Sequence, residues 1–195
     1  MTTTSFIKVK NKLFIKVLFF FIIFNNLANA SCTTSVNPSQ SNIESIKVEF
    51  LEYRKWIINL TRILIKPNDS IKLRKKRFKA NVIFEINNNS KCIFPASVRA
   101  HGDLNDHLEL KNGNPVSSLN INLKEGNIDN ITKFILFIPK SRRFDNEIFV
   151  ATLLKELNYL SPATFYTDVT VGQIKTKYIF QEKIEKEFLE RNRKI

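Results

Sequence analysis

The sequence predicts an α+β fold in which a mostly antiparallel sheet carries one packed helix. Three observations support this prediction. Several segments alternate apolar and polar residues with a period of two, which is typical of half-buried strands. The period changes to that of a helix in residues 144–160. Two further alternating segments then follow on either side of a Gly-Gln turn, as expected for a hairpin.

Seven segments have strand character, and the first of them is ambiguous. Residues 46–53 alternate, but a helical pattern is an alternative there and continues through residues 54–65. Residues 131–139 form an almost continuous apolar run closed by a proline, which indicates a central buried strand. The other expected strands are residues 78–86, 94–102, 117–124, 161–171 and 174–184.

The main helix is expected to begin at Asp145 or Asn146, either of which can cap its first turn. Apolar residues recur at helical spacing from Ile148 to Leu157, and we expect this stripe to lie in the core. A second helix starts in "EKEFLERNRKI" and shows no stop signal before the chain ends. We therefore expect residues 46–195 to be a lobe that is truncated at its C-terminus.

The N-terminus has the layout of a secretory signal peptide. Four lysines and no acid precede the apolar run "VLFFFIIF", and "ANA" supplies a small-residue cleavage site. The apolar run is too short to cross a membrane, which takes about 20 residues. We expect residues 1–30 to be removed and residues 31–45 to form a flexible leader. The mature protein should be exported to the periplasm, the cell envelope or the medium.

The formal net charge is +13, and +9 remains when the four lysines of the signal peptide are subtracted (13 − 4 = 9). Lys (22) far outnumbers Arg (9), and Asn, Ile and Phe are also abundant, which indicates a genome-wide composition bias. We therefore expect no specific nucleic-acid partner. The alternative is a polyanionic partner, such as an anionic lipid or a phosphorylated substrate. The densest basic run is "IKLRKKRFKA" (71–80).

The chain has two cysteines, Cys32 and Cys92. In an exported protein they are able to form a disulfide. The alternative is that Cys32 lies in a loose leader and that Cys92 is a buried, inert thiol.

The segment "VRAHGDLNDHLEL" (98–110) holds both histidines of the chain and allows three interpretations. A loop with Gly102 can present backbone N–H groups to phosphates, with Arg99 supplying positive charge. His101 and His107, with the nearby aspartates, have the chemistry of metal ligands, but no HExxH or CxxC pattern accompanies them. The third interpretation is an ordinary Gly-Asp turn between two strands. We assign no metal ligand here.

Charged residues also gather where the helix begins and where the last strand ends. Arg142 and Arg143, beside a helix N-terminus, suit either an anion site or a solvated loop. Glu147, in the first turn, favours the helix dipole. Glu182 suits the N-terminal acid of the next helix.

Residues 95–192 resemble the spore-coat kinase (CotH-type) family. The resemblance rests on "VRAHGDLNDH", "SSLNINL", "KFILFIPKSRRFDNEIFVATLLKELNYLSPATFYTDVTV" and "YIFQEKIEKEFLE". Members have a strand ending in Arg-x-x-Gly, a paired strand, and a helix entered through a charged, Asn-containing loop. A hairpin then finishes with a Tyr and, a few residues later, a Glu. This order is also that of a protein-kinase small lobe.

The resemblance implies a kinase-like N-terminal lobe over residues 46–195 that uses ATP with Mg²⁺ or Mn²⁺. It implies that one wall of the nucleotide cleft is formed by Arg99, Gly102, Arg142, Arg143, Glu147 and Glu182. In a kinase-like lobe Glu147 would pair with a lysine, and Glu182 would belong to the linker beside the bound base. Two departures matter. Many members have a Lys before the strand that matches "SSLNINL", where this chain has "NPVSS"; Lys111 or Lys124 would have to substitute. The family's metal-binding and catalytic acids lie in a second lobe that would follow residue 195, so no catalytic residue is assigned.

Two functions follow from these observations. The first is an exported, CotH-like ATP-dependent phosphotransferase, present as an N-terminal fragment that binds ATP weakly or not at all and is inactive alone. The second is a non-catalytic envelope domain that binds an anionic glycan or a protein partner.

Overall fold

The computed structural model describes residues 31–32, 42–65, 70–86, 90–102 and 105–192. The strands are β1 (Ser31–Cys32), β2 (Ile43–Phe50), β3 (Phe78–Ile86), β4 (Ser90–Ala100), β5 (Leu108–Lys111), β6 (Asn114–Ser117), β7 (Leu119–Leu123), β8 (Lys133–Phe137), β9 (Thr164–Val171) and β10 (Ile174–Glu182). The helices are α2 (Tyr53–Ile65), α3 (Ser70–Lys75), α4 (Asn146–Glu156) and α5 (Lys186–Arg191), with short 3₁₀ turns η3 (Asn105–His107) and η4 (Pro139–Arg142).

Seven strands form a closed barrel. Their order is β4-β3-β2-β9-β10-β8-β7, and β7 pairs back onto β4. Every pairing in this ring is antiparallel except that of β2 with β9, which is parallel. The predicted α+β class and mostly antiparallel sheet are therefore confirmed, whereas closure of the sheet was not predicted. Within this ring each strand pairs with a neighbour on both sides, so the ring itself has no open edge to be protected from other chains.

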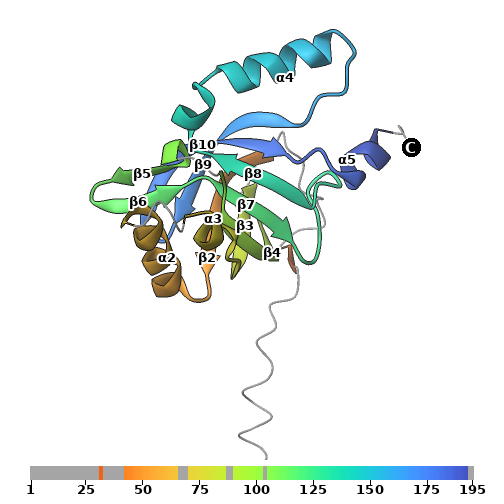
Figure 1. Ribbon diagram of the computed structural model, residues 1–195. Helices are drawn as coiled ribbons and strands as arrows, with labels where there is room; N and C mark the ends of the chain where they lie inside the picture. The colour runs from red at the N-terminus through yellow and green to blue at the C-terminus, as the bar shows by residue number, and fades with distance from the viewer. Residues whose placement is uncertain (1–30, 33–41, 66–69, 87–89, 103–104, 193–195) are drawn as a thin grey trace, which may run out of the picture.

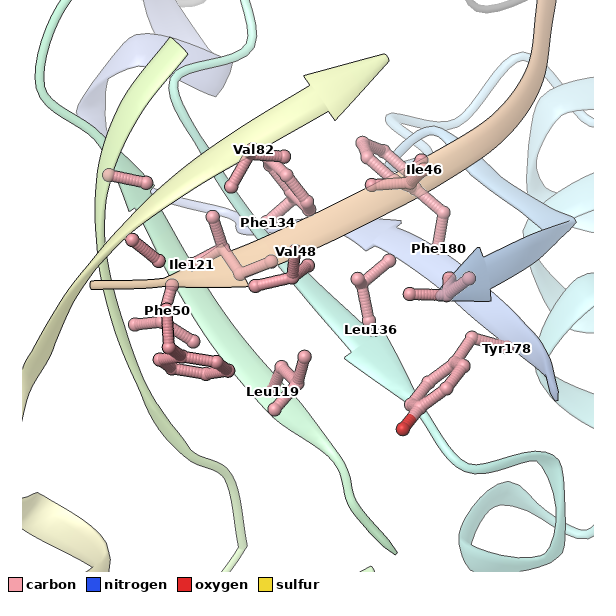
Figure 2. Close-up of a cluster of buried hydrophobic side chains, with 14 of the residues drawn as sticks. Ile46, Val48, Phe50, Val82, Leu119, Ile121, Phe134, Leu136, Tyr178 and Phe180 are labelled. Carbon is pink, nitrogen blue, oxygen red and sulfur yellow. The ribbon is translucent and has the colours of Figure 1, made fainter. Parts of the chain in front are cut away.

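The interior of the barrel is apolar because each strand alternates inward and outward side chains. Figure 2 shows side chains from β2, β3, β7, β8 and β10 pointing toward one another in this interior. Phe180 connects them, since its ring stacks on Phe134 at 4.6 Å and on Phe165 at 4.7 Å between centroids. The predicted buried strand is confirmed, because Phe134 and Leu136 of β8 are fully buried.

The helix that packs on the core is α2. Its buried residues Trp56, Leu60 and Ile63 lie on one face of the helix at helical spacing. The Trp56 ring stacks on Phe50 at 4.4 Å and meets the edge of Phe78 at 5.4 Å. Both readings of the ambiguous first segment are realised in succession, because β2 ends at Phe50 and the helix starts three residues later.

The prediction that the apolar stripe of α4 lies in the core is wrong. Of this helix only Ala151 is buried; Leu153 is 45% exposed and Leu157, which follows the helix, is 56% exposed. In Figure 1, α4 lies above the barrel, on the side away from α2. The physical reason is that the strands already fill the barrel with their own side chains, which leaves α4 an outer surface to cover. Ile148 is the α4 residue that packs against the small apolar cluster of that surface.

Strand boundaries differ from expectation in several places. β4 begins at Ser90, before the expected start, and Pro95 pairs with Asn81 inside it. The hairpin of β5 and β6 was not predicted. Asp145 stands at the N-cap of α4, but its carboxylate accepts a hydrogen bond from the Tyr166 hydroxyl at 2.8 Å instead of capping the helix.

Cys32 and Cys92 form a disulfide, with their Cα atoms 4.1 Å apart, so the first of the two cysteine alternatives is confirmed. The bond joins β1 to β4, where Cys32 also pairs with Cys92 in the strand ladder. The predicted signal peptide (1–30) and residues 33–41 of the predicted leader lie outside the described residues. Among the helices that are described, none has the length and apolar character needed to cross a membrane.

Candidate functional site

One cleft lies between α4 and the outer face of β8 and β10, and its volume is about 360 Å³. Its apolar lining comes from Ile135, Val150, Ala151, Leu154, Pro162 and Ile184. Its polar lining comes from Glu147, Gln181, Glu182 and Lys183. An apolar slot with a few convergent polar groups is the usual form of a small-molecule site, and its volume falls in the usual range.

The floor of the cleft continues as a row across four strands. Arg99 pairs with Asn120, Asn120 with Ile135, and Ile135 with Gln181. Directly paired residues point to the same side of a sheet, so these four side chains share the outer face of the barrel. Arg99 therefore lies two strands, or about 10 Å, from the Ile135 position.

Glu147 stands at the mouth of the cleft between two partners. Gln181 donates its side-chain amide to Glu147 at 2.6 Å, and the Arg142 Nε atom lies 3.9 Å from the carboxylate. The Arg142 guanidinium is also held over the Phe137 ring, 4.0 Å from its centroid. Glu147 thus has an arginine beside it rather than the lysine considered above.

Glu182 closes one end of the cleft and is almost fully buried. Its carboxylate pairs with Arg191 of α5 and accepts a hydrogen bond from the Ala163 backbone N–H at 3.3 Å. Burial raises the pKa of Glu182, although Arg191 acts in the opposite direction. The Glu182 backbone N–H donates to the Ala163 carbonyl at 2.9 Å, so this N–H is already used within the protein.

Two lysines lie beside this end of the cleft and were missed from the sequence. Lys133 binds Glu185 and Glu187, each at 2.8 Å, and these bonds raise the pKa of the lysine. Lys183 lines the cleft and pairs with Glu185 as well. The position of Lys133 inside the apolar run 131–139 was the available signal, because a charged residue in such a run usually has a partner of opposite charge.

The two histidines pack as aromatic rings. His101 and His107 meet edge to face at 5.2 Å, and Phe137 lies 5.1 Å from the first and 6.0 Å from the second. His107 Nδ1 also lies 3.2 Å from the Ser118 hydroxyl. Gly102 has a φ of +84°, and a Cβ there would lie 2.0 Å from the His107 ring, so this packing requires glycine.

The structure thus brings together part of the predicted set. Glu147 and Glu182 line one cleft, and Arg142 contacts the first of them. Gly102 supports the histidine packing and Arg143 is exposed, with a left-handed backbone at φ 52° that ends η4; neither is among the residues that line the cleft.

A divalent metal fits this site poorly. Within the described ranges, no three His, Cys, Asp or Glu side chains are grouped so as to hold an ion. Asp103, one of the candidate metal ligands of the loop, lies outside those ranges. We therefore derive no chemical step through a metal. Comparison with family models and with curated proteins found no match to this chain.

Proposed function

We propose that this chain forms the nucleotide-facing wall of an exported phosphotransferase similar to the CotH-type kinases. The observation that carries the proposal is the cleft beneath α4, which has apolar walls, Lys183 in its lining, and Arg142 beside the lining residue Glu147. The chain also has the element order that the sequence resemblance implies, namely strand β8, helix α4, hairpin β9–β10 and then α5.

An adenine ring is flat and mostly apolar, so it suits the space between Ile135 on the sheet and Val150 and Leu154 on the helix. Phosphates need positive charge, which Lys183 and Arg142 supply near the cleft. The Glu182 backbone N–H is committed to Ala163, so this account places the base against side chains and assigns no contact to that N–H.

The proposal concerns binding, and the described residues on their own are expected to be inactive. Phosphoryl transfer needs metal ions and a residue that orients the nucleophile. Purified residues 31–195, incubated with labelled ATP, Mg²⁺ or Mn²⁺ and a general protein acceptor, should show no turnover. Turnover that survives repurification and disappears in Glu182→Ala would place the catalytic groups within these residues and contradict the proposal.

Binding is tested best with adenosine, because an uncharged ligand avoids non-specific attraction to the basic protein. Methyl NMR of residues 31–195 should show concentration-dependent shifts at Ile135 and Ile184 in the cleft and none at Ile58 on α2. Val150→Trp fills the cleft and should abolish these shifts. The matched control is Leu153→Trp, which adds the same side chain to the same helix at a position outside the cleft lining.

Absence of cleft shifts at millimolar adenosine, or equal loss in both tryptophan variants, would contradict nucleotide binding. It would favour the second candidate, a non-catalytic envelope domain that binds a protein partner. The observation behind this candidate is the outward surface of α4, where Phe149 is 66% and Leu153 45% exposed. Single exposed apolar residues are ordinary, whereas a contiguous group marks an interaction surface.

Export is the remaining part of the proposal. The Cys32–Cys92 disulfide supports an oxidising compartment, in which such bonds persist. Intact-mass analysis of the protein from the native host should give Ser31 as the first residue. A mature protein that retains Met1 would contradict export by signal cleavage.

A further inference from the structure

The positive charge of this protein is concentrated in one segment. Residues 51–79 contain ten Lys or Arg and two Asp or Glu, a net charge of 10 − 2 = +8. The charge of residues 31–195 is +9, so the rest of that stretch carries only +1. A composition bias would spread lysines along the chain, and this distribution therefore requires a local explanation.

The described parts of this segment form α2, α3 and the start of β3, at the side of the barrel away from α4 (Figure 1). On α2 the buried face holds Trp56, and the opposite face is exposed. Arg54, Ile58, Arg62 and Ile65 are spaced by four, four and three residues, so they line up on that exposed face.

The apolar members of this face are solvent-exposed. Ile58 is 41% and Ile65 72% exposed, and Ile71 of the neighbouring α3 is 52% exposed. Arg62 on α2 and Lys75 on α3 are exposed as well, and the two helices contact each other. We call the surface formed by Arg54, Ile58, Arg62, Ile65, Ile71 and Lys75 the basic end.

The chemistry of the basic end fits a partner that is both anionic and apolar. Isoleucines that lie among cations gain by burial in acyl chains while the cations meet lipid phosphates. Nucleic acid would use the cations but not the isoleucines, and single strands are bound by stacking bases on aromatic rings. The aromatic residues of this segment are not exposed, since Trp56 and Phe78 are buried and Tyr53 is half-buried.

We propose that the basic end docks on the surface of a bilayer that contains anionic phospholipid. The helices lie on the interface, with the isoleucines entering the acyl boundary and the cations at the level of the phosphates. Because α4 lies on the other side of the barrel, the docked protein keeps its cleft turned away from the lipid (Figure 1). The inference does not depend on what the cleft binds.

The test is vesicle co-sedimentation of residues 31–195, which contain every described element. Vesicles of phosphatidylcholine alone should not bind, and vesicles with one quarter phosphatidylglycerol should bind more tightly as salt is lowered. Arg54→Gln/Arg62→Gln should weaken binding about thirtyfold, since each cation near such a surface contributes about a fivefold gain in affinity. Ile58→Ser/Ile65→Ser should weaken it about tenfold.

The matched control is Lys124→Gln/Lys140→Gln, which removes two exposed lysines outside the basic end and should change binding less than twofold, because the surface field decays within about 10 Å. Circular dichroism verifies that each variant is folded. The proposal is overturned if anionic vesicles do not bind, or if the isoleucine variant binds like the parent. Tighter, isoleucine-independent binding to duplex DNA would overturn it in favour of a nucleic-acid partner.

Discussion

Helices α2 and α4 are similar in length and apolar content but are attached to the barrel in different ways. Three large side chains of α2 are fully buried, among them Trp56 at 1% exposure. Helix α4 buries one alanine and is held mainly by hydrogen bonds at its ends and side. Tyr166 binds Asp145, Gln181 binds Glu147, and the Ser161 hydroxyl donates to the Ala151 carbonyl at 2.7 Å.

This difference shows that the period of apolar residues identifies a helix but does not decide what the helix covers. Burial of large side chains makes α2 part of the cooperative core. Hydrogen bonds at a solvent-accessible margin contribute about 1 kcal/mol each, so we expect α4 to open locally. A helix attached in this way is suited to form the wall of a cleft that admits a ligand.

The largest expected effect is a difference in stability between truncating a side chain of α2 and truncating one of α4. Trp56→Ala should lower the free energy of unfolding of residues 31–195 by about 3–5 kcal/mol, because it leaves a cavity against Phe50 and Phe78. Phe149→Ala on α4 should change it by less than about 0.5 kcal/mol, because that ring is 66% exposed. Urea unfolding without reductant measures both. Equal losses would show that α4 is as much a part of the core as α2.

Reduction of the Cys32–Cys92 disulfide should also affect α2 and α4 differently. The bond closes a loop of 60 residues, so in the chain-entropy model its loss lowers global stability by about 4 kcal/mol. Amides of α2 that exchange only on global unfolding should exchange faster, by the factor by which this loss of stability raises the unfolded population. Amides of α4 that exchange by local opening should keep their rates in hydrogen-exchange mass spectrometry. A parallel acceleration of α4 would contradict local opening.

The hydrogen bonds that hold α4 should act on α4 alone. Tyr166→Phe and Ser161→Ala each remove one of them and should raise the population of the open α4 by about fivefold, equivalent to about 1 kcal/mol. Global stability should be nearly unchanged. Thr61→Ala removes a comparable exposed hydroxyl from α2 and is the control. If the α4 variants change only the urea midpoint, these bonds belong to the global fold.

The smallest expected effect is a pH dependence of stability. It arises at α5, which ion pairs with Lys133 attach to the barrel, and apolar attachment such as that of α2 creates none. Hydrogen bonds from Lys133 hold the pKa values of Glu185 and Glu187 below the ordinary glutamate value. Their stabilisation is therefore present above the ordinary value of about 4.3 and is lost as the pH falls through the lowered values. Lys133→Gln should be less stable than the parent protein at pH 7, and the two should be about equally stable near pH 2. A difference that is independent of pH would rule out this linkage.

The sequence was sufficient for the parts of the fold that depend on local pattern. Alternation located β3, and the apolar run located β8, because inward side chains of a barrel are apolar regardless of how the sheet closes. Closure itself depends on the pairing of β7 with β4 and of β2 with β9, which are distant in sequence and leave no local signal. The exposure of α4 is a consequence of that closure and was therefore predicted incorrectly.

For the candidate site, the sequence identified charged residues but not their partners. Glu147 and Glu182 were named, and they line the same cleft because α4 crosses the end of β10. Gln181 gains its place from the register of β10 with β8, and Lys183 from a backbone hydrogen bond to Lys133 just past that register; only the fold defines both. Gly102 was named for phosphate contact, whereas its positive φ serves the packing of the His107 ring.

The most direct test of this account is hydrogen exchange with and without saturating adenosine. If the cleft beneath α4 binds the base, adenosine should slow exchange in residues 146–156 by stabilising the closed helix, and leave residues 53–65 unchanged. Val150→Trp should remove the protection and Leu153→Trp should retain it. Protection that is absent from α4, or equal in α4 and α2, would contradict the assignment of this cleft as the ligand site.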